Sequence, residues 1–369
     1  MSKQSAENKL LLSILIAVLV LGMPFFKAEA NAVLDGELKS LIRLQTSSPR
    51  VFQAEQNLLL NWQQYFKTGL FHIALDASYQ WPGGEGTLAL DQAYFDYYGG
   101  NFDLRLGRQR FLWGTALQIN PSSILNPPNP RDPWGAGLPV YGLNLDYYPW
   151  GPFQLTAVYL PFFRPALEAI PGQPQIPVEI PEPVWEEGQF ALKLAALGIG
   201  GTDFSLSYFR GRENLPTLHS VSPPQASYRE VQIAAADLAT AWGDLGIWAE
   251  GAAYFPKGGD PYFQAILGGE YGFRNGLLLW TQYLQGRDKS QKTQKMLFCG
   301  AQQTFALWEW RLASLYNLDQ KGYLFNPELS FSLAEAAVLS LGARYFGKDP
   351  LGPLPPEENS IYAQVKVSF

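Results

Sequence analysis

The sequence predicts an all-β protein: a closed antiparallel transmembrane β-barrel of about eighteen strands, or about sixteen if two of the weaker segments are loops. Three observations predict this fold. From residue 34 onward, segments of about 9 to 15 residues alternate apolar and polar side chains. Only 16% of the 369 residues are charged, while 14% are aromatic, and ordinary soluble domains carry about 25% charged residues. The links between the segments are short and long in turn.

Residues 1–30 have the features of a secretory signal peptide. Lys3 and Lys9 precede an apolar stretch from Leu10 to Met23, and the small-residue site Ala28-Glu29-Ala30 follows. This order of a basic start, an apolar run and small residues is typical of a cleaved leader. We expect cleavage after Ala30 and a single barrel domain over 31–369. The alternative, a membrane anchor, needs about 20 apolar residues.

Clusters of Gly, Pro, Asn and Asp separate the alternating segments, as expected for turns between strands. The segments cover residues 34–46, 52–66, 69–81, 88–98, 102–110, 139–149, 152–163, 187–197, 202–212, 227–241, 244–255, 261–274, 276–286, 294–305, 308–319, 322–333, 336–346 and 359–369. Two of them, 227–241 and 294–305, alternate poorly, so the sequence leaves the direction of their side chains open.

The third segment shows the alternation clearly. Phe71 and Ile73 fall on one face, and His72 and Asp76 fall on the other. In a bilayer only the apolar face can contact lipid, so the polar face is expected to line the lumen.

The end of the sequence has the pattern of a strand with one apolar face. Residues 361, 363, 365, 367 and 369 are apolar and alternate with polar or amphipathic ones. A chain that ends in such a strand on an aromatic resembles bacterial outer-membrane β-barrels. The resemblance implies that the closing strand pairs with the first, and that the barrel-assembly machinery recognises Phe369, Val367 and Val365. It also implies a position in outer-membrane lipid.

The links also alternate in length along the chain. Short ones, such as 67–68 and 242–243, are mostly separated by longer ones, of which 111–138 and 164–186 are the longest. Three of the intervening links are also short: 47–51, 256–260 and 320–321. In bacterial barrels short turns face the periplasm and long loops face outside. Aromatic residues gather near segment ends, as they do at membrane interfaces. The alternative, a soluble sandwich with an aromatic core, rarely needs this many strands.

The longest link, 111–138, is the third outside loop in this count. With the residues before it, the loop contains Gly107-Arg108-Gln109, Trp113-Gly114, Asn120-Pro121 and Asn126-Pro127. This signature resembles porin-like outer-membrane proteins, and the resemblance implies a channel that the third loop narrows. Repeated Asn-Pro steps stiffen a loop, because proline fixes its own φ and restricts the residue before it.

Charged residues near this loop and on the polar strand faces are the candidates for shaping a pore. They are Arg108, Arg110, Arg131 and Asp132 around the loop, and Arg43, Arg105, Asp76 and Asp103 on the strands. The alternative for the loop residues is an exposed cap with solvated charges. For the strand residues it is salt bridging along the barrel wall. Acidic and basic residues mix on the polar faces, so no ion selectivity is predicted.

Other functions find little support. His72 and His219 are the only histidines, and no metal-ligand, cofactor or nucleophile motif accompanies them. The net charge of -6 argues against a nucleic-acid partner. The single Cys299 cannot form an internal disulfide. We therefore expect an exported outer-membrane channel for passive diffusion of small polar solutes, as a monomer or a homo-oligomer. A surface attachment barrel with a plugged lumen is the alternative, and an outer-membrane enzyme ranks third.

Overall fold

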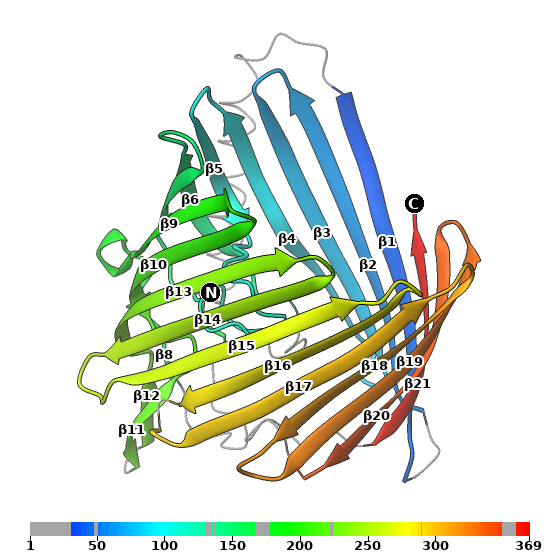
Figure 1. Ribbon diagram of the computed structural model, residues 1–369. Helices are drawn as coiled ribbons and strands as arrows, with labels where there is room; N and C mark the ends of the chain where they lie inside the picture. The colour runs from blue at the N-terminus through cyan, green and yellow to red at the C-terminus, as the bar shows by residue number, and fades with distance from the viewer. Residues whose placement is uncertain are drawn as a thin grey trace.

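The protein is a closed antiparallel β-barrel (Figure 1). The computed structural model describes residues 31–47, 51–117, 119–129, 135, 137–166, 178–221, 224–288, 290–348 and 359–369. Within these residues, 18 strands form one sheet, and each pairs with the barrel strands before and after it in sequence. The fold predicted from the sequence is confirmed, with the larger of the two expected strand numbers. The predicted signal peptide, residues 1–30, lies outside the described residues.

The barrel strands follow the predicted segments closely. They are β1 (Asn31–Gln45), β2 (Val51–Phe66), β3 (Gly69–Trp81), β4 (Glu85–Tyr98), β5 (Phe102–Gln109), β6 (Val140–Tyr147), β7 (Phe153–Leu160), β9 (Gln189–Ile199), β10 (Thr202–Arg212), β13 (Glu230–Trp242), β14 (Leu245–Pro256), β15 (Tyr262–Gly272), β16 (Leu277–Arg287), β17 (Thr293–Thr304), β18 (Trp308–Asn317), β19 (Gly322–Ala334), β20 (Ala337–Gly347) and β21 (Ser360–Ser368).

The barrel closes where its last strand meets its first. β21 pairs with β1 from Glu37 opposite Ser368 to Gln45 opposite Ser360, and the two strands lie side by side in Figure 1. Phe369 extends the pairing, because its N–H donates to Gly36 O (3.0 Å) and its carbonyl accepts from Gly36 N (2.8 Å). A closed sheet leaves no strand edge unpaired.

Each barrel strand has one outward and one inward face. On the outward face of β14 and β15, Phe255 is 49% exposed and Leu267 60% exposed, whereas the inward Glu250 is 4% exposed. Paired residues in a sheet point to the same side, so the register extends this assignment from strand to strand. Outward faces are rich in exposed apolar side chains, as a lipid-facing wall requires.

The two segments that alternate poorly have apolar residues on both faces. In β13 the inward residues include Val231, Ile233 and Ala235, and in β17 they include Met296 and Phe298, all buried. These side chains belong to two apolar clusters that include residues of the link between β5 and β6. The alternation is weak because this link covers the inward face and replaces water there.

Two of the longer links contain regular structure, although the sequence predicted only loops. β8 (Val178–Glu179), β11 (Thr217–Val221) and β12 (Pro224–Ser227) form a small separate sheet, and a 3-10 turn, η1 (Trp185–Glu187), precedes β9. Val178, Ala226 and Tyr228 form a buried cluster in these links. Among the described residues, no helix is long and apolar enough to cross a membrane.

Candidate functional site

The candidate site is the long loop, residues 110–139, together with the inward faces that it contacts. Its beginning and end are joined by Asn126, which accepts a hydrogen bond from Phe111 N (2.8 Å) and donates one to Leu138 O (2.7 Å). Just before the loop, the buried Gln109 donates to Gly142 O (3.0 Å) on β6. A single asparagine amide can both accept and donate, so it can hold two chain segments in register.

The first half of the long loop turns sharply between Trp113 and Ser123. Gly114 has φ +89°, a left-handed conformation that side chains rarely adopt. Asn120 Oδ1 accepts from Ser123 N (2.9 Å) and from Ser122 Oγ (3.3 Å). Short polar side chains that bond to the backbone in this way stabilise turns. Each of these residues therefore helps to define the path of the loop.

The turn is attached to the inward face of β14, which lies six strands from β5 in the barrel. Glu250 Oε2 accepts hydrogen bonds from Thr115 N (3.0 Å) and Ala116 N (3.2 Å), and Oε1 accepts from Ser122 N (2.6 Å). Tyr254, on the same face of β14, donates to Pro121 O (2.8 Å). Four hydrogen bonds from two side chains thus hold the turn against the barrel wall.

A second attachment lies on β16. Gln282 is fully buried; its Oε1 accepts from Leu117 N (2.9 Å) and from Trp248 Nε1 (3.0 Å), and its Nε2 contacts Ile119 O at 3.4 Å. Apolar contacts add to these bonds. Phe111, Trp113, Ile124 and Leu125 pack with inward residues of β6 to β14, and Ala116 and Ile119 pack beside those of β14 to β18.

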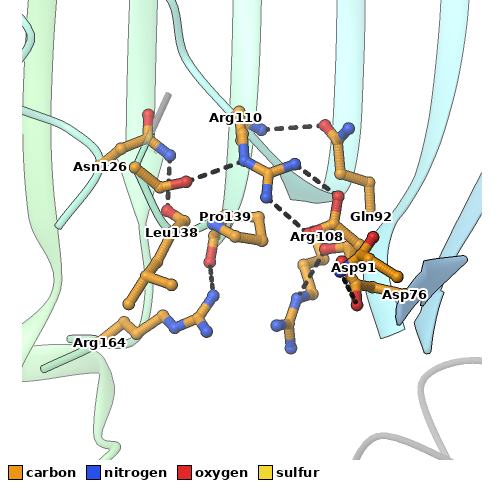
Figure 2. A network of polar contacts seen from close by, with 11 residues as sticks. Asp76, Asp91, Gln92, Arg108, Arg110, Asn126, Leu138, Pro139 and Arg164 are labelled. Carbon is orange, nitrogen blue, oxygen red and sulfur yellow. Dashed lines mark hydrogen bonds and ion pairs between the residues drawn. The ribbon is translucent and has the colours of Figure 1, made fainter. Parts of the chain in front are cut away.

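Arg110 makes the main charged contact at the base of the long loop (Figure 2). Its two terminal nitrogens bind both oxygens of Asp91 at 2.5 and 2.6 Å, and its Nε donates to Gly137 O (2.9 Å). Its backbone N–H donates to Gln92 Oε1 (3.3 Å). Asp91 is the extra residue of a β-bulge, because Gln92 pairs with Ala74 and Leu90 pairs with Leu75. Bulges commonly re-aim a side chain next to a functional site.

Arg108 and Arg164 complete an arginine cluster, defined as Arg108, Arg110 and Arg164. Arg108 shares the outward face of β5 with Leu106, and its Nε donates to Asp91 O (3.0 Å). Arg164 donates to Pro139 O. Burial, and then the positive charges of Arg108 and Arg110, lower the pKa of Arg164 to about 10. Its guanidinium therefore remains charged at neutral pH.

The structure distributes the predicted pore residues over several places. Asp76, on β3, faces inward near the arginine cluster and accepts from Asn57 Nδ2 at 3.5 Å. Arg43 lies on the inward face of β1, at its loop end, and donates to Gln53 Oε1 (2.9 Å). Arg131 and Asp132 lie outside the described residues.

Arg105 and Asp103 are not close to the long loop, since they lie toward the short-turn end of β5. Arg105 binds Asp96 with two bonds of 2.6 and 2.8 Å. Asp103 accepts from Tyr148 Oη (2.9 Å), and burial together with this carboxylate raises the pKa of Tyr148 to about 12. Tyr148 therefore stays protonated as the donor.

Asp91, Arg164 and Gln282 were not predicted as site residues from the sequence. For Asp91 the sequence does contain a signal. The apolar residues of this strand fall at 88 and 90 and then at 93, 95 and 97, so the alternation slips by one at Asp91-Gln92. A slip of one residue within a strand indicates a bulge. Arg164 and Gln282 have no comparable signal, because the groups that they contact on the long loop are backbone atoms.

The inward wall opposite the long loop remains accessible to solvent and is charged. The carboxylate oxygens of Glu37 lie 3.4 Å from Lys39 Nζ and 3.4 Å from Lys366 Nζ. The side chains of the two lysines are 42% and 41% exposed. On β18, Arg311 is 48% exposed and lies 3.1 Å from Glu328 of β19. Water therefore reaches these charged residues on the inner face of β18 to β1, whereas the long loop packs on inward residues from β6 to β18.

No group of three or more His, Cys, Asp or Glu side chains among the described residues could hold a metal ion. His72 stacks on Tyr94 (4.8 Å between ring centroids) and lies 3.3 Å from Gln63 Nε2. The side chain of His219 lies outside the described residues.

No family model and no curated protein matches the sequence. The structure, however, is similar to solved outer-membrane barrels. OccK5 (OpdH) of Pseudomonas aeruginosa aligns at a TM-score of 0.60 with 12% identity, over 94% of this chain and 98% of that one. OccAB1 of Acinetobacter baumannii aligns at 0.59 with 10% identity, over 94% and 98%. The outer membrane protein opdK of Pseudomonas aeruginosa aligns at 0.58 with 9% identity, over 92% and 98%.

The chain has the fold of these barrels. At such low identity the likeness extends to architecture alone, because unrelated functions can share one fold. Function is therefore argued from the inward faces and the long loop.

Proposed function

We propose that this protein is an outer-membrane channel through which small polar solutes diffuse passively. The observation that carries the proposal is the solvent-exposed, charged inner wall of β18 to β1. A barrel of this size can enclose an aqueous channel, and charged side chains on an inner wall are stable only where water or partners reach them. The likeness in fold to the outer membrane protein opdK supports the location.

We propose further that the long loop narrows this channel. Support comes from its attachment to Glu250, Tyr254 and Gln282, which lie on inward faces of β14 and β16. A loop that starts at β5 and bonds to β14 must extend into the lumen between them. The passage then runs between the long loop and the charged wall. Arg110, Arg164 and Asp91 lie at the loop's base and are the residues that a solute is expected to meet there, whereas Arg108, predicted as a pore residue, lies on the outward face of β5.

The remaining parts of the proposal concern export and assembly. Residues 1–30 would direct secretion and be removed after Ala30. Phe369, Val367 and Val365 would present the closing strand to the barrel-assembly machinery. All three side chains lie on the outward face, and Phe369 is 60% exposed. Outward apolar side chains would contact lipid, or a second copy of the barrel if it forms a homo-oligomer.

Conductance in a planar bilayer tests the channel and the constriction together. The mature protein should give discrete ion currents, and deletion of residues 115–133 should increase the conductance, because it removes the segment that fills part of the lumen. Deletion within 288–292, a link between β16 and β17 outside this segment, is the matched control and should leave the conductance nearly unchanged.

The outcomes separate the three functions considered. No current from either form would contradict the channel and favour a plugged attachment barrel. A current whose conductance does not increase on deletion would support the channel but contradict the constriction by the long loop. Lipid hydrolysis by the purified barrel that is abolished by His72→Ala would instead favour an enzyme.

A further inference from the structure

Glu250 is a buried carboxylate that accepts hydrogen bonds from the long loop. It is 4% exposed, and its two oxygens accept from the N–H groups of Thr115, Ala116 and Ser122 at 2.6 to 3.2 Å. Among the described residues it forms no ion pair. Three N–H dipoles directed at one carboxylate provide charge-assisted bonds, which are stronger than neutral ones.

The neighbouring charged groups are engaged elsewhere. Asp237 pairs with Glu250 across β13 and β14, but it accepts from Ser205 Oγ and lies 4.0 Å from Lys193 Nζ. Lys193 in turn lies over the Trp113 ring, at 5.7 Å from its centroid. Glu250 is therefore compensated mainly by the long loop itself, and displacement of the loop would remove these three N–H donors from the carboxylate.

Particular residues of the long loop leave space for this carboxylate and direct N–H groups toward it. A Cβ at Gly114 would lie 2.5 Å from Glu250 Oε2 and would also collide with the Asn120 amide. The positive φ of Gly114 and the bonds of Asn120 to Ser122 and Ser123 direct the N–H groups of the turn toward one point. The Trp113-Gly114 and Asn120-Pro121 pairs thus build a backbone cradle for one anionic oxygen pair.

We propose that Glu250 is the positioning residue of the long loop, and that its negative charge holds Thr115, Ala116 and Ser122 at one place in the lumen. This rests on the proposed function, because a fixed loop defines one channel cross-section. Tyr254 and Gln282 hold the same turn through neutral bonds. Glu250→Gln replaces one acceptor oxygen by a donor NH₂ group that faces N–H donors, so the attachment weakens while the side-chain volume is kept.

Amide hydrogen exchange measures the attachment without reference to transport. In Glu250→Gln the amides of Thr115, Ala116 and Ser122 should exchange roughly tenfold faster or more, since a buried charge-assisted hydrogen bond is lost. Glu270→Gln is the matched control. Glu270 lies on the inward face of β15, and its described contacts include none with the long loop, so exchange in residues 114–122 should not change. Unchanged exchange in a folded Glu250→Gln barrel would overturn the proposal.

Single-channel recording then tests the consequence for the lumen. Glu250→Gln should add conductance substates or raise the mean conductance, whereas Glu270→Gln should keep one steady level. In a barrel that lacks residues 115–133, Glu250→Gln should have no further effect on the fluctuation of the conductance. An equal effect in both backgrounds would mean that the charge acts on the ions directly, and positioning would be wrong. If Glu250→Gln fails to assemble, Glu250→Asp, which keeps the charge on a shorter side chain, should assemble and retain slow exchange.

The two proposals can fail separately. Faster amide exchange in Glu250→Gln together with no current from any form would support the positioning role of Glu250 and contradict the channel. A conducting wild-type barrel that gains conductance on loop deletion, with Glu250→Gln indistinguishable from wild type, would keep the channel and remove the positioning role.

Discussion

At the residue scale, the amide side chains of the loop signature form hydrogen bonds to the backbone. Gln109 bonds to β6, Asn120 closes a turn, and Asn126 ties the two ends of the long loop together. Their common feature is a side-chain amide that replaces a missing backbone partner. Charge near the loop is supplied by Arg108 of the signature and by Arg110, Arg164 and Asp91 outside it.

The arginine cluster predicts two opposite changes in ion selectivity. Arg164→Gln removes a positive charge and should shift the reversal potential in a salt gradient toward cations. Asp91→Asn removes the partner of Arg110 and should shift it toward anions, because local charge governs permeation in narrow pores. Arg287→Gln, at the outward-facing loop end of β16, is the control and should shift it little. Equal shifts in the same direction for both variants would contradict the placement of the cluster beside the ion path.

At the element scale, most of the barrel was predictable from the sequence and most of the site was not. All eighteen strands were predicted, because lipid on one side and water on the other impose a period of two. The pattern failed in β13 and β17, where the long loop replaces water on the inward face. That packing joins residues more than a hundred positions apart, such as Ser122 and Glu250, and no local pattern encodes it.

The closing strand gives a prediction of its own. Phe369→Ala should lower the yield of barrel assembled in cells, yet leave refolding of purified protein in detergent nearly unchanged. The ring is largely exposed, so its removal costs little folding free energy, while its recognition during assembly would be lost. Ile361→Ala, an exposed residue on the same outward face of β21, is the control. An equal loss of yield in both variants would assign Phe369 a merely structural role.

At the scale of the whole molecule, the links between strands are longer at one end of the barrel than at the other. At one end lie the long loop, the links from β7 to β9 and from β10 to β13, and the small β8, β11 and β12 sheet. At the other end lie the short turns, the first residues of β1 and the last residues of β21. Short turns at the periplasmic side and longer loops outside are the usual arrangement of bacterial barrels, so the molecule should sit with the long-loop end facing the medium.

Cysteine labelling in whole cells tests that orientation. In a Cys299→Ser background, Ser290→Cys at the long-loop end should react with a maleimide that cannot cross the outer membrane. Arg274→Cys, in the short turn between β15 and β16, should react only after the cells are broken. Both native side chains are exposed, so a difference in labelling reports the side of the membrane and not burial. Reversed labelling of the two engineered sites would mean that the barrel is inverted and that the long loop faces the periplasm.

Cys299 itself lies on the outward face of β17, opposite Thr281 and Ser314, and should react in unaltered protein with a lipid-soluble thiol reagent in preference to a charged one.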